Sequence, residues 1–106
     1  GDERRLRELI RNVVENALRH ARTRITIRCA VEGDRALLQI ADDGLGVDVS
    51  DRERIFERFF RADGDARGSG LGLAIAQWVA RAHDGLLVLD DVPSGASFTA
   101  RIPLLR

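Results

Sequence analysis

The amino-acid sequence predicts an α+β fold, a two-layer α/β sandwich in which helices pack on one face of a mixed, mainly antiparallel sheet. The elements follow the order helix, two strands, glycine-rich segment, helix, two strands. Strands joined by a hairpin pair antiparallel, and such sheets bury one face under helices. The 106 residues suffice for one domain, which we assign to residues 1–106.

The first helix is predicted from Glu3 to about Ala21. Its apolar residues recur at the helical spacing of three and four, which indicates one buried face. Asp2 is a candidate N-cap, and Glu3 suits the positive end of the helix dipole. The apolar positions are Leu6, Leu9, Ile10, Val13, Val14, Ala17, Leu18 and Ala21.

A hairpin is predicted next, from a strand at 24–31 and a returning strand at 36–41. Residues alternate in the first strand, so Ile25, Ile27, Cys29 and Val31 share one face that we expect to be buried. Gly33 and Asp34 suit a two-residue loop. Cys29 is the only cysteine, which excludes an intramolecular disulfide, and we expect it to be a small core residue.

The segment from Asp42 to Gly70 contains no long predicted element, and six of the ten glycines fall between Gly44 and Gly72. A short helix is predicted at 50–59, with Ser50 as N-cap and Glu53 as its capping-box partner. The small and polar residues at 63–69 are typical of a mobile loop.

The second helix is predicted from Leu71 to about Asp84, with Gly85 as its C-cap. Two strands follow, at 86–89 and 97–104, and Pro103 restricts the last one to an edge or terminal position there. The apolar stripe of the helix is Leu71, Ile75, Trp78, Val79 and Ala82.

Composition excludes several classes of function. The formal net charge is zero, which does not favour a binder of nucleic acid or of anionic membranes. No apolar run approaches the ~20 residues of a membrane span. All 17 basic residues are arginine, so the lysine that a P-loop or a protein-kinase fold requires is absent.

Asn12 and Asn16 lie four residues apart and therefore share one face of the first helix. Asparagine is not favoured within helices, and an amide oxygen is a suitable ligand for Mg²⁺. Taken alone, the pair is also consistent with a solvated polar face.

Two glycine-rich segments could contact a ligand. The Asp42–Gly46 segment follows a strand directly, and a carboxylate there can accept a hydrogen bond from an exocyclic amine such as that of adenine. Residues 68–73 open the second helix, whose first turn offers free N–H groups to phosphate. Taken alone, each is also consistent with an ordinary turn or a flexible loop.

In this order, these segments resemble the catalytic domain of bacterial sensor histidine kinases, in the GHKL superfamily of ATP-binding proteins with the Bergerat fold. Residues 9–20 look like the N box, 42–46 the first glycine box, 55–61 the F box and 68–73 the second glycine box. The tail resembles the same domain at 83–85 and 95–103. The likeness covers nearly the whole chain.

The resemblance implies ATP and Mg²⁺ as ligands, with Asn16 holding Mg²⁺ and Asn12 lining the phosphate site. Arg19 takes a place that is often a phosphate-contacting lysine, and His20 one that lies beside the nucleotide. Asp42 is expected to read the adenine amine. The other residues implied at the ATP site are Gly44, Gly46, Arg67, Gly68, Ser69, Gly70, Leu71, Gly72 and Leu73, with Arg61 a further candidate for the γ-phosphate. Phe56, Phe59 and Phe60 are implied as lid anchors.

The function implied is transfer of the γ-phosphoryl group of ATP to a histidine of a dimerisation domain, in two-component signal transduction. The hydrolysing members of the superfamily carry a glutamate where Asn12 stands, and an amide cannot act as a general base. Two alternatives remain: a serine kinase of the anti-sigma-factor type, and a degenerate nucleotide-binding module that only docks partners. We expect the intact site residues Asn16, Asp42 and Gly70 to disfavour the latter.

The implied partners are the protein's own dimerisation and phosphoacceptor domain and a response regulator, with no nucleic acid and no direct membrane contact. The implied location is cytoplasmic, as a domain of a membrane-anchored sensor kinase. The chain departs from the family pattern in three respects. It begins almost at the first helix, its segment at 62–67 is short for an ATP lid, and Asp84 replaces a usual glycine. We therefore expect an N-terminally truncated domain that binds ATP without phosphorylating itself.

Overall fold

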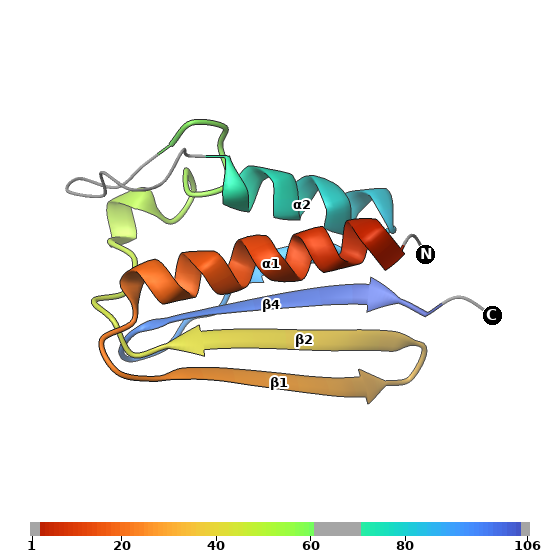
Figure 1. Cartoon of the computed structure of the whole chain (residues 1–106), viewed down its shortest axis with the longest axis horizontal. Helices are drawn as coiled ribbons and strands as arrows, with labels where there is room; N and C mark the ends of the chain where they lie inside the picture. The colour runs from red at the N-terminus through yellow and green to blue at the C-terminus, as the bar shows by residue number, and fades with distance from the viewer. Residues whose placement is uncertain (1–2, 61–70, 105–106) are drawn as a thin grey trace.

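The computed structural model describes residues 3–60 and 71–104, and its elements follow the predicted order (Figure 1). The helices are α1 (Glu3–His20) and α2 (Gly72–Ala82), with a short 3-10 helix, η1 (Val49–Asp51), between them. The strands are β1 (Ile25–Glu32), β2 (Arg35–Asp42), β3 (Leu86–Leu89) and β4 (Ala96–Pro103). The candidate cap Asp2 and the predicted loop at 63–69 lie outside the described residues.

The four strands form one sheet in the order β1-β2-β4-β3. Every pairing among the described residues is antiparallel. The prediction of a mainly antiparallel sheet is confirmed, but these strands include no parallel pair. Gly33 and Asp34 form the predicted two-residue loop, since Glu32 pairs with Arg35. β4 is a central strand, and Pro103 is its last residue. Proline is tolerated at this terminal position because no further residue of β4 follows it in the hydrogen-bonded ladder.

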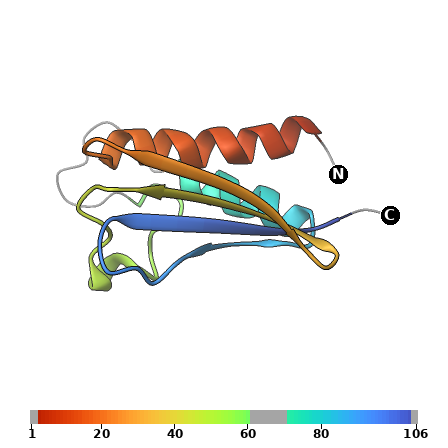
Figure 2. The ribbon, with the colours of Figure 1, turned by 90° about the horizontal axis from the view of Figure 1, so that it is seen from below.

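The core lies between the sheet and the two helices, which confirms the two-layer prediction (Figure 2). Helix α1 packs over β2, and α2 packs over β3 and β4 as well as against α1. The sheet residues that face the helices are aligned by the register, since Ile40 pairs with Phe98 and Ala100 with Leu87. The buried apolar side chains from the helices are Leu9, Val13, Ala17, Ala76, Val79 and Ala80.

Strand β1 is an edge strand that the helices do not cover. The register places Ile27 opposite Ile40 and Cys29 opposite Leu38, so the predicted facing of its side chains is right. Their predicted burial is wrong, because Ile27 is 53% exposed, Val31 is 66% exposed and Cys29 is exposed. The reason is the position of α1, which lies over β2 rather than over β1.

The segment after β2 is less helical than predicted. In place of a helix at 50–59, the chain forms η1 followed by turns. Asp48, not Ser50, is the N-cap residue of η1, and its side chain makes no capping hydrogen bond. The segment is held by burial of Ile55 and by packing of Phe56 against the core.

Helix α2 differs from the prediction at one face and at its end. Trp78 is 57% exposed, and the Arg5 guanidinium lies 5.1 Å from its ring centre, where a cation is attracted to the aromatic face. The left-handed residue that ends the helix is Asp84, with φ 60°, not Gly85. The Gly85 N–H donates to the Ala80 carbonyl at 2.8 Å, which completes the cap.

None of the described helices combines the length and the low charge that a membrane-spanning helix needs.

Candidate functional site

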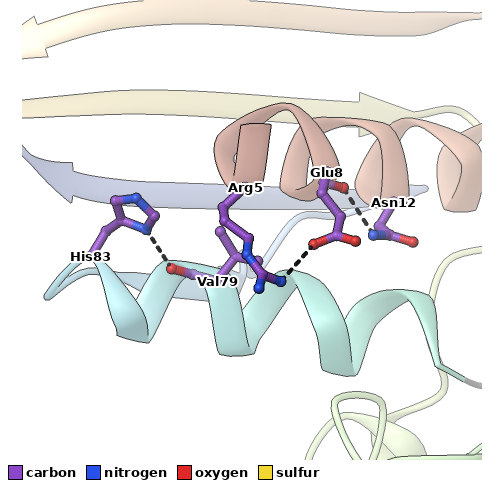
Figure 3. Close-up of polar contacts among 5 residues, drawn as sticks. All are labelled: Arg5, Glu8, Asn12, Val79 and His83. Atoms are coloured by element: carbon purple, nitrogen blue, oxygen red, sulfur yellow. Dashed lines mark hydrogen bonds and ion pairs between the residues drawn. The ribbon is translucent and has the colours of Figure 1, made fainter. Parts of the chain in front are cut away.

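Helix α1 presents Asn12 toward the start of α2. The Asn12 side-chain N–H donates to the Glu8 carbonyl at 2.9 Å, as Figure 3 shows. This bond directs the Asn12 Oδ1 atom toward α2, where it would lie 3.3 Å from a Cβ atom added at Gly72. The pair is therefore not on a solvated face, because Asn12 lies partly buried against the first turn of α2 and Asn16 is buried.

Asn16 is buried, which is unusual for an amide side chain in a helix. Its Oδ1 atom accepts a hydrogen bond from the Arg19 guanidinium at 3.4 Å. This long contact holds a positive charge beside the amide oxygen. An amide oxygen is a ligand that Mg²⁺ accepts together with phosphate oxygens, and the guanidinium would offset the negative charge of those phosphates.

Asp42, the last residue of β2, is 8% exposed. Its Oδ1 atom accepts the backbone N–H of Gly44 at 2.8 Å, which fixes the orientation of the carboxylate. No hydrogen bond from the described residues reaches its Oδ2 atom. A buried carboxylate with one oxygen available is suited to accept a hydrogen bond from an amine of a bound ligand.

The loop after β2 lies directly against two other segments. A Cβ atom at Gly44 would lie 2.0 Å from the His20 carbonyl oxygen, so only glycine fits against the last turn of α1. Gly46 has φ 82°, and a Cβ atom there would lie 2.7 Å from the Gly95 carbonyl oxygen in the turn before β4. These contacts place the two predicted halves of the site, α1 and the end of β2, side by side.

Asp43 is a residue that the sequence reasoning did not single out. Its carboxylate accepts hydrogen bonds from the Arg22 N–H at 2.8 Å and from the Thr23 N–H and hydroxyl. The Thr23 hydroxyl, followed by the N–H groups of Thr23 and Arg24, holds the pKa of Asp43 far below its ordinary value. The signal that could have found it is the Thr23 side chain in the short connection before β1.

The aromatic residues of the F box do not act alike. Phe56 packs edge-to-face on Phe98, with ring centres 6.1 Å apart, and so anchors this segment to the sheet. Phe60 is partly buried beneath the Arg54 guanidinium, 4.8 Å from its ring centre. Phe59 is exposed with φ 66°, and the lid that it is predicted to anchor lies outside the described residues.

The structure brings together part of the predicted ATP site. Asn12 lies against Gly72 at the start of α2, and Arg19 contacts Asn16 one turn further along α1. At the C-terminal end of α1, Gly44 lies against the His20 carbonyl and the Asp42 carboxylate. Leu71 and Leu73 flank Gly72 at the start of α2, and both are partly buried. The remaining predicted residues, Arg61, Arg67, Gly68, Ser69 and Gly70, lie outside the described residues.

The chain is similar to known sensor kinases along almost its whole length. It is 40% identical to the sensor histidine kinase CpxA of Escherichia coli K12 over 100 residues, which are 90% of this chain and 22% of CpxA. The chain thus spans about a fifth of the length of the curated relatives it matches.

Two solved structures have the same fold. The mycobacterial sensor histidine kinase MprB superposes with a TM-score of 0.88 at 34% identity, over 97% of this chain and 74% of that structure. Full-length ShkA in complex with AMPPNP gives 0.84 at 34% identity, over 97% of this chain and 22% of ShkA.

The profile of one family matches residues 1–106, the family described as histidine kinase-, DNA gyrase B-, and HSP90-like ATPase. With two helices on an antiparallel sheet and with amide and carboxylate groups at the ends of α1 and β2, the chain belongs to this family.

Proposed function

We propose that this chain is the ATP-binding catalytic domain of a sensor histidine kinase, and that the longer protein transfers the γ-phosphoryl group of ATP to a histidine of its dimerisation domain. The observation that carries the proposal is the buried Asp42 carboxylate, which has one oxygen fixed by Gly44 and one without a protein partner among the described residues. The contact of the following loop with the end of α1, at Gly44 and His20, supports a nucleotide that spans the Asp42 carboxylate and the α1 amides.

Each site residue that the structure describes is proposed to bind the nucleotide or to orient it. Asp42 accepts the adenine amine, and Gly44 and Gly46 allow close approach of the ligand to the backbone. Asn16 supplies an oxygen ligand to Mg²⁺, and Arg19 places positive charge beside the phosphates. When bound, Mg²⁺ supplies charge neutralisation at the γ-phosphoryl group. Asn12 lines the phosphate path at the start of α2.

Phosphoryl transfer to a side chain fits better than hydrolysis of ATP. Hydrolysis needs a group that removes a proton from water, and the Asn12 amide cannot do so. One of its two N–H donors is bonded to the Glu8 carbonyl, and its oxygen, although a hydrogen-bond acceptor, is not basic enough to take a proton from water. Transfer to a histidine needs positioning and charge neutralisation but no such base.

The partners follow from this function. We propose that the phosphoacceptor histidine belongs to a helical dimerisation domain of the same longer protein, and that a response regulator receives the phosphoryl group. The relatives are named sensor proteins, which supports this reading over a serine kinase of the anti-sigma-factor type. A cytoplasmic position for the domain accords with access to ATP.

Titration calorimetry with AMPPNP, with and without Mg²⁺, tests the proposal on this chain. We expect saturable binding that Mg²⁺ tightens. Asp42→Asn should weaken binding by about tenfold or more, because an amide that replaces the carboxylate loses a charge-assisted hydrogen bond. The matched control is Asp48→Asn, since that exposed carboxylate makes no capping hydrogen bond.

Two further outcomes decide the case. Asn16→Ala should remove the Mg²⁺ enhancement while binding of the metal-free nucleotide persists. A folded chain that binds no nucleotide, or an Asp42→Asn variant that binds as well as the parent, contradicts the proposal and favours a docking module.

A further inference from the structure

The two halves of the proposed nucleotide site come from different elements and are far apart in sequence. The amide half lies on α1, and the carboxylate half follows β2, more than twenty residues later. Between them the chain leaves α1, forms β1 and returns through a hairpin. The geometry of the site therefore depends on what fixes the last turn of α1 against the end of β2.

One side chain links the residue after β2 to the connection that follows α1. The Asp43 Oδ1 atom accepts the N–H groups of Arg22 and Thr23 at 2.8 and 3.0 Å. Its Oδ2 atom accepts the Thr23 N–H at 3.2 Å and the Thr23 hydroxyl at 2.5 Å. The Asp43 N–H donates to the Arg24 carbonyl at 3.3 Å. Asp43 thus holds the whole connection between α1 and β1.

We infer that Asp43 and Thr23 form a positioning pair that sets the spacing between the phosphate half and the adenine half of the site. The inference rests on the proposed function. Neither residue is assigned a contact with the nucleotide, because the carboxylate and the hydroxyl bond each other and the backbone of the connection. They act through their neighbours, Asp42 in the chain and His20 at the end of α1.

The structure shows why the connection between α1 and β1 needs hydrogen bonds to fix it. Arg22, Thr23 and Asp43 are exposed, so burial does not hold the segment in place. Yet the close approach of Gly44 to the His20 carbonyl tolerates no intervening Cβ atom, so the two segments must meet in one arrangement. Three donors, the N–H groups of Arg22 and Thr23 and the Thr23 hydroxyl, bond one ionised carboxylate and supply that constraint, and charge-assisted bonds are the stronger kind.

The lowered pKa of Asp43 supports the same conclusion. The Thr23 hydroxyl is its largest cause, so the carboxylate stays ionised and able to accept these bonds at any pH used for nucleotide binding. If these hydrogen bonds only stabilised the local turn, their loss would affect folding and not the relative affinities for different ligands. A positioning pair must also affect a ligand that spans both halves more than a ligand that occupies one.

That difference defines the experiment. Affinities for Mg-AMPPNP, which spans both halves, and for adenosine, which occupies the adenine half only, are measured by NMR titration on the parent chain and on Thr23→Val. We expect Mg-AMPPNP to bind about tenfold more weakly to the variant, the order of effect that a small misplacement of binding groups produces. Adenosine should bind within about twofold of the parent, because Asp42 keeps its bond to Gly44.

Two companion variants separate positioning from general damage. Thr23→Ser keeps a hydroxyl and should restore Mg-AMPPNP binding, whereas Thr26→Val makes the same chemical change at an exposed threonine of β1 and should have no effect. Asp43→Asn, which cannot accept the hydroxyl bond at its amide nitrogen, should reproduce Thr23→Val. Asp43→Asn thus tests the inference independently if Thr23→Val folds poorly.

The outcomes distinguish this inference from the proposed function. If the parent chain binds Mg-AMPPNP and both Thr23→Val and Asp43→Asn bind it equally well, the positioning pair is refuted and the proposed function stands. Equal weakening of adenosine and Mg-AMPPNP also refutes it, because the effect would then be local to the adenine half. A parent chain that binds neither ligand refutes the proposed function itself.

Discussion

Strands β1 and β4 have the same length, yet their burial is opposite. Five consecutive residues of β4, from Ala96 to Ala100, are buried, whereas β1 is exposed at every position after its first. Strand β4 lies between β2 and β3 and beneath α2, while β1 is an edge without a helix above it. Position in the sheet, not alternation of residue types, decides how much each strand contributes to stability.

The two faces of β4 are buried by different means. On the helix face, Phe98 and Ala100 pack in the apolar core. On the opposite face, Ser97 and Thr99 both donate their hydroxyls to Asp90, at 2.8 and 2.6 Å, and Gln39 donates to Ser97. Strand β1 has neither arrangement and is held at its start by the hydrogen bonds of Asp43 to the preceding connection.

The largest effect is expected on the helix face of β4. Phe98→Ala should lower the free energy of unfolding by about 3–5 kcal/mol, because it removes a ring that is 3% exposed and leaves a cavity beneath Phe56. Urea denaturation followed by circular dichroism measures the change. A loss below about 1 kcal/mol would show that β4 is not the central support of the core.

The polar face of β4 should give the next largest effect. Asp90→Ala leaves the two buried hydroxyls without their acceptor and should cost about 1–3 kcal/mol of unfolding free energy. Asp91→Ala is the matched control, since that side chain is 93% exposed and makes one ion pair at 3.6 Å with Arg52. The comparison fails if both variants lose the same stability.

A substitution on β1 should cost less. Ile27→Ala removes a side chain that is already half exposed, so it should lower the unfolding free energy by about 1 kcal/mol or less in the same urea assay. Ile40, which pairs with Ile27 but is fully buried, provides the contrast, since Ile40→Ala should cost about 2–5 kcal/mol. Equal losses at the two positions would mean that another surface covers β1.

The smallest effect is expected at Cys29. Cys29→Ser should change the unfolding free energy by less than about 0.5 kcal/mol, because the side chain is exposed. A thiol reagent should also modify Cys29 in the folded chain as fast as in the chain unfolded by urea. Slow modification of the folded chain would restore the original expectation of a core cysteine.

In the site, too, local sequence predicted some features, whereas contacts between distant segments could not be predicted. The spacing of Asn12 and Asn16 predicted their common face, and the Asp42–Gly46 segment predicted a carboxylate followed by a close backbone approach. The sequence could not indicate that Gly44 meets the His20 carbonyl, because that contact joins segments separated by the hairpin. Asp43 was missed for the same reason, since its partners Arg22 and Thr23 are near only in space.

By itself, the sequence determined the identity and order of the two long helices and of the four strands, because periodicities of 3.6 and 2 residues are local properties. It also determined the hairpin at Gly33 and the family, which the profile match over residues 1–106 confirmed. Only the tertiary structure decided that α1 covers β2 and leaves β1 exposed, that Asp84 rather than Gly85 takes the left-handed position, and that Ser97 and Thr99 are buried. The alternation of residue types in a strand predicts which side chains share a face. Their burial depends on which elements pack over that face, and those elements are distant in the sequence.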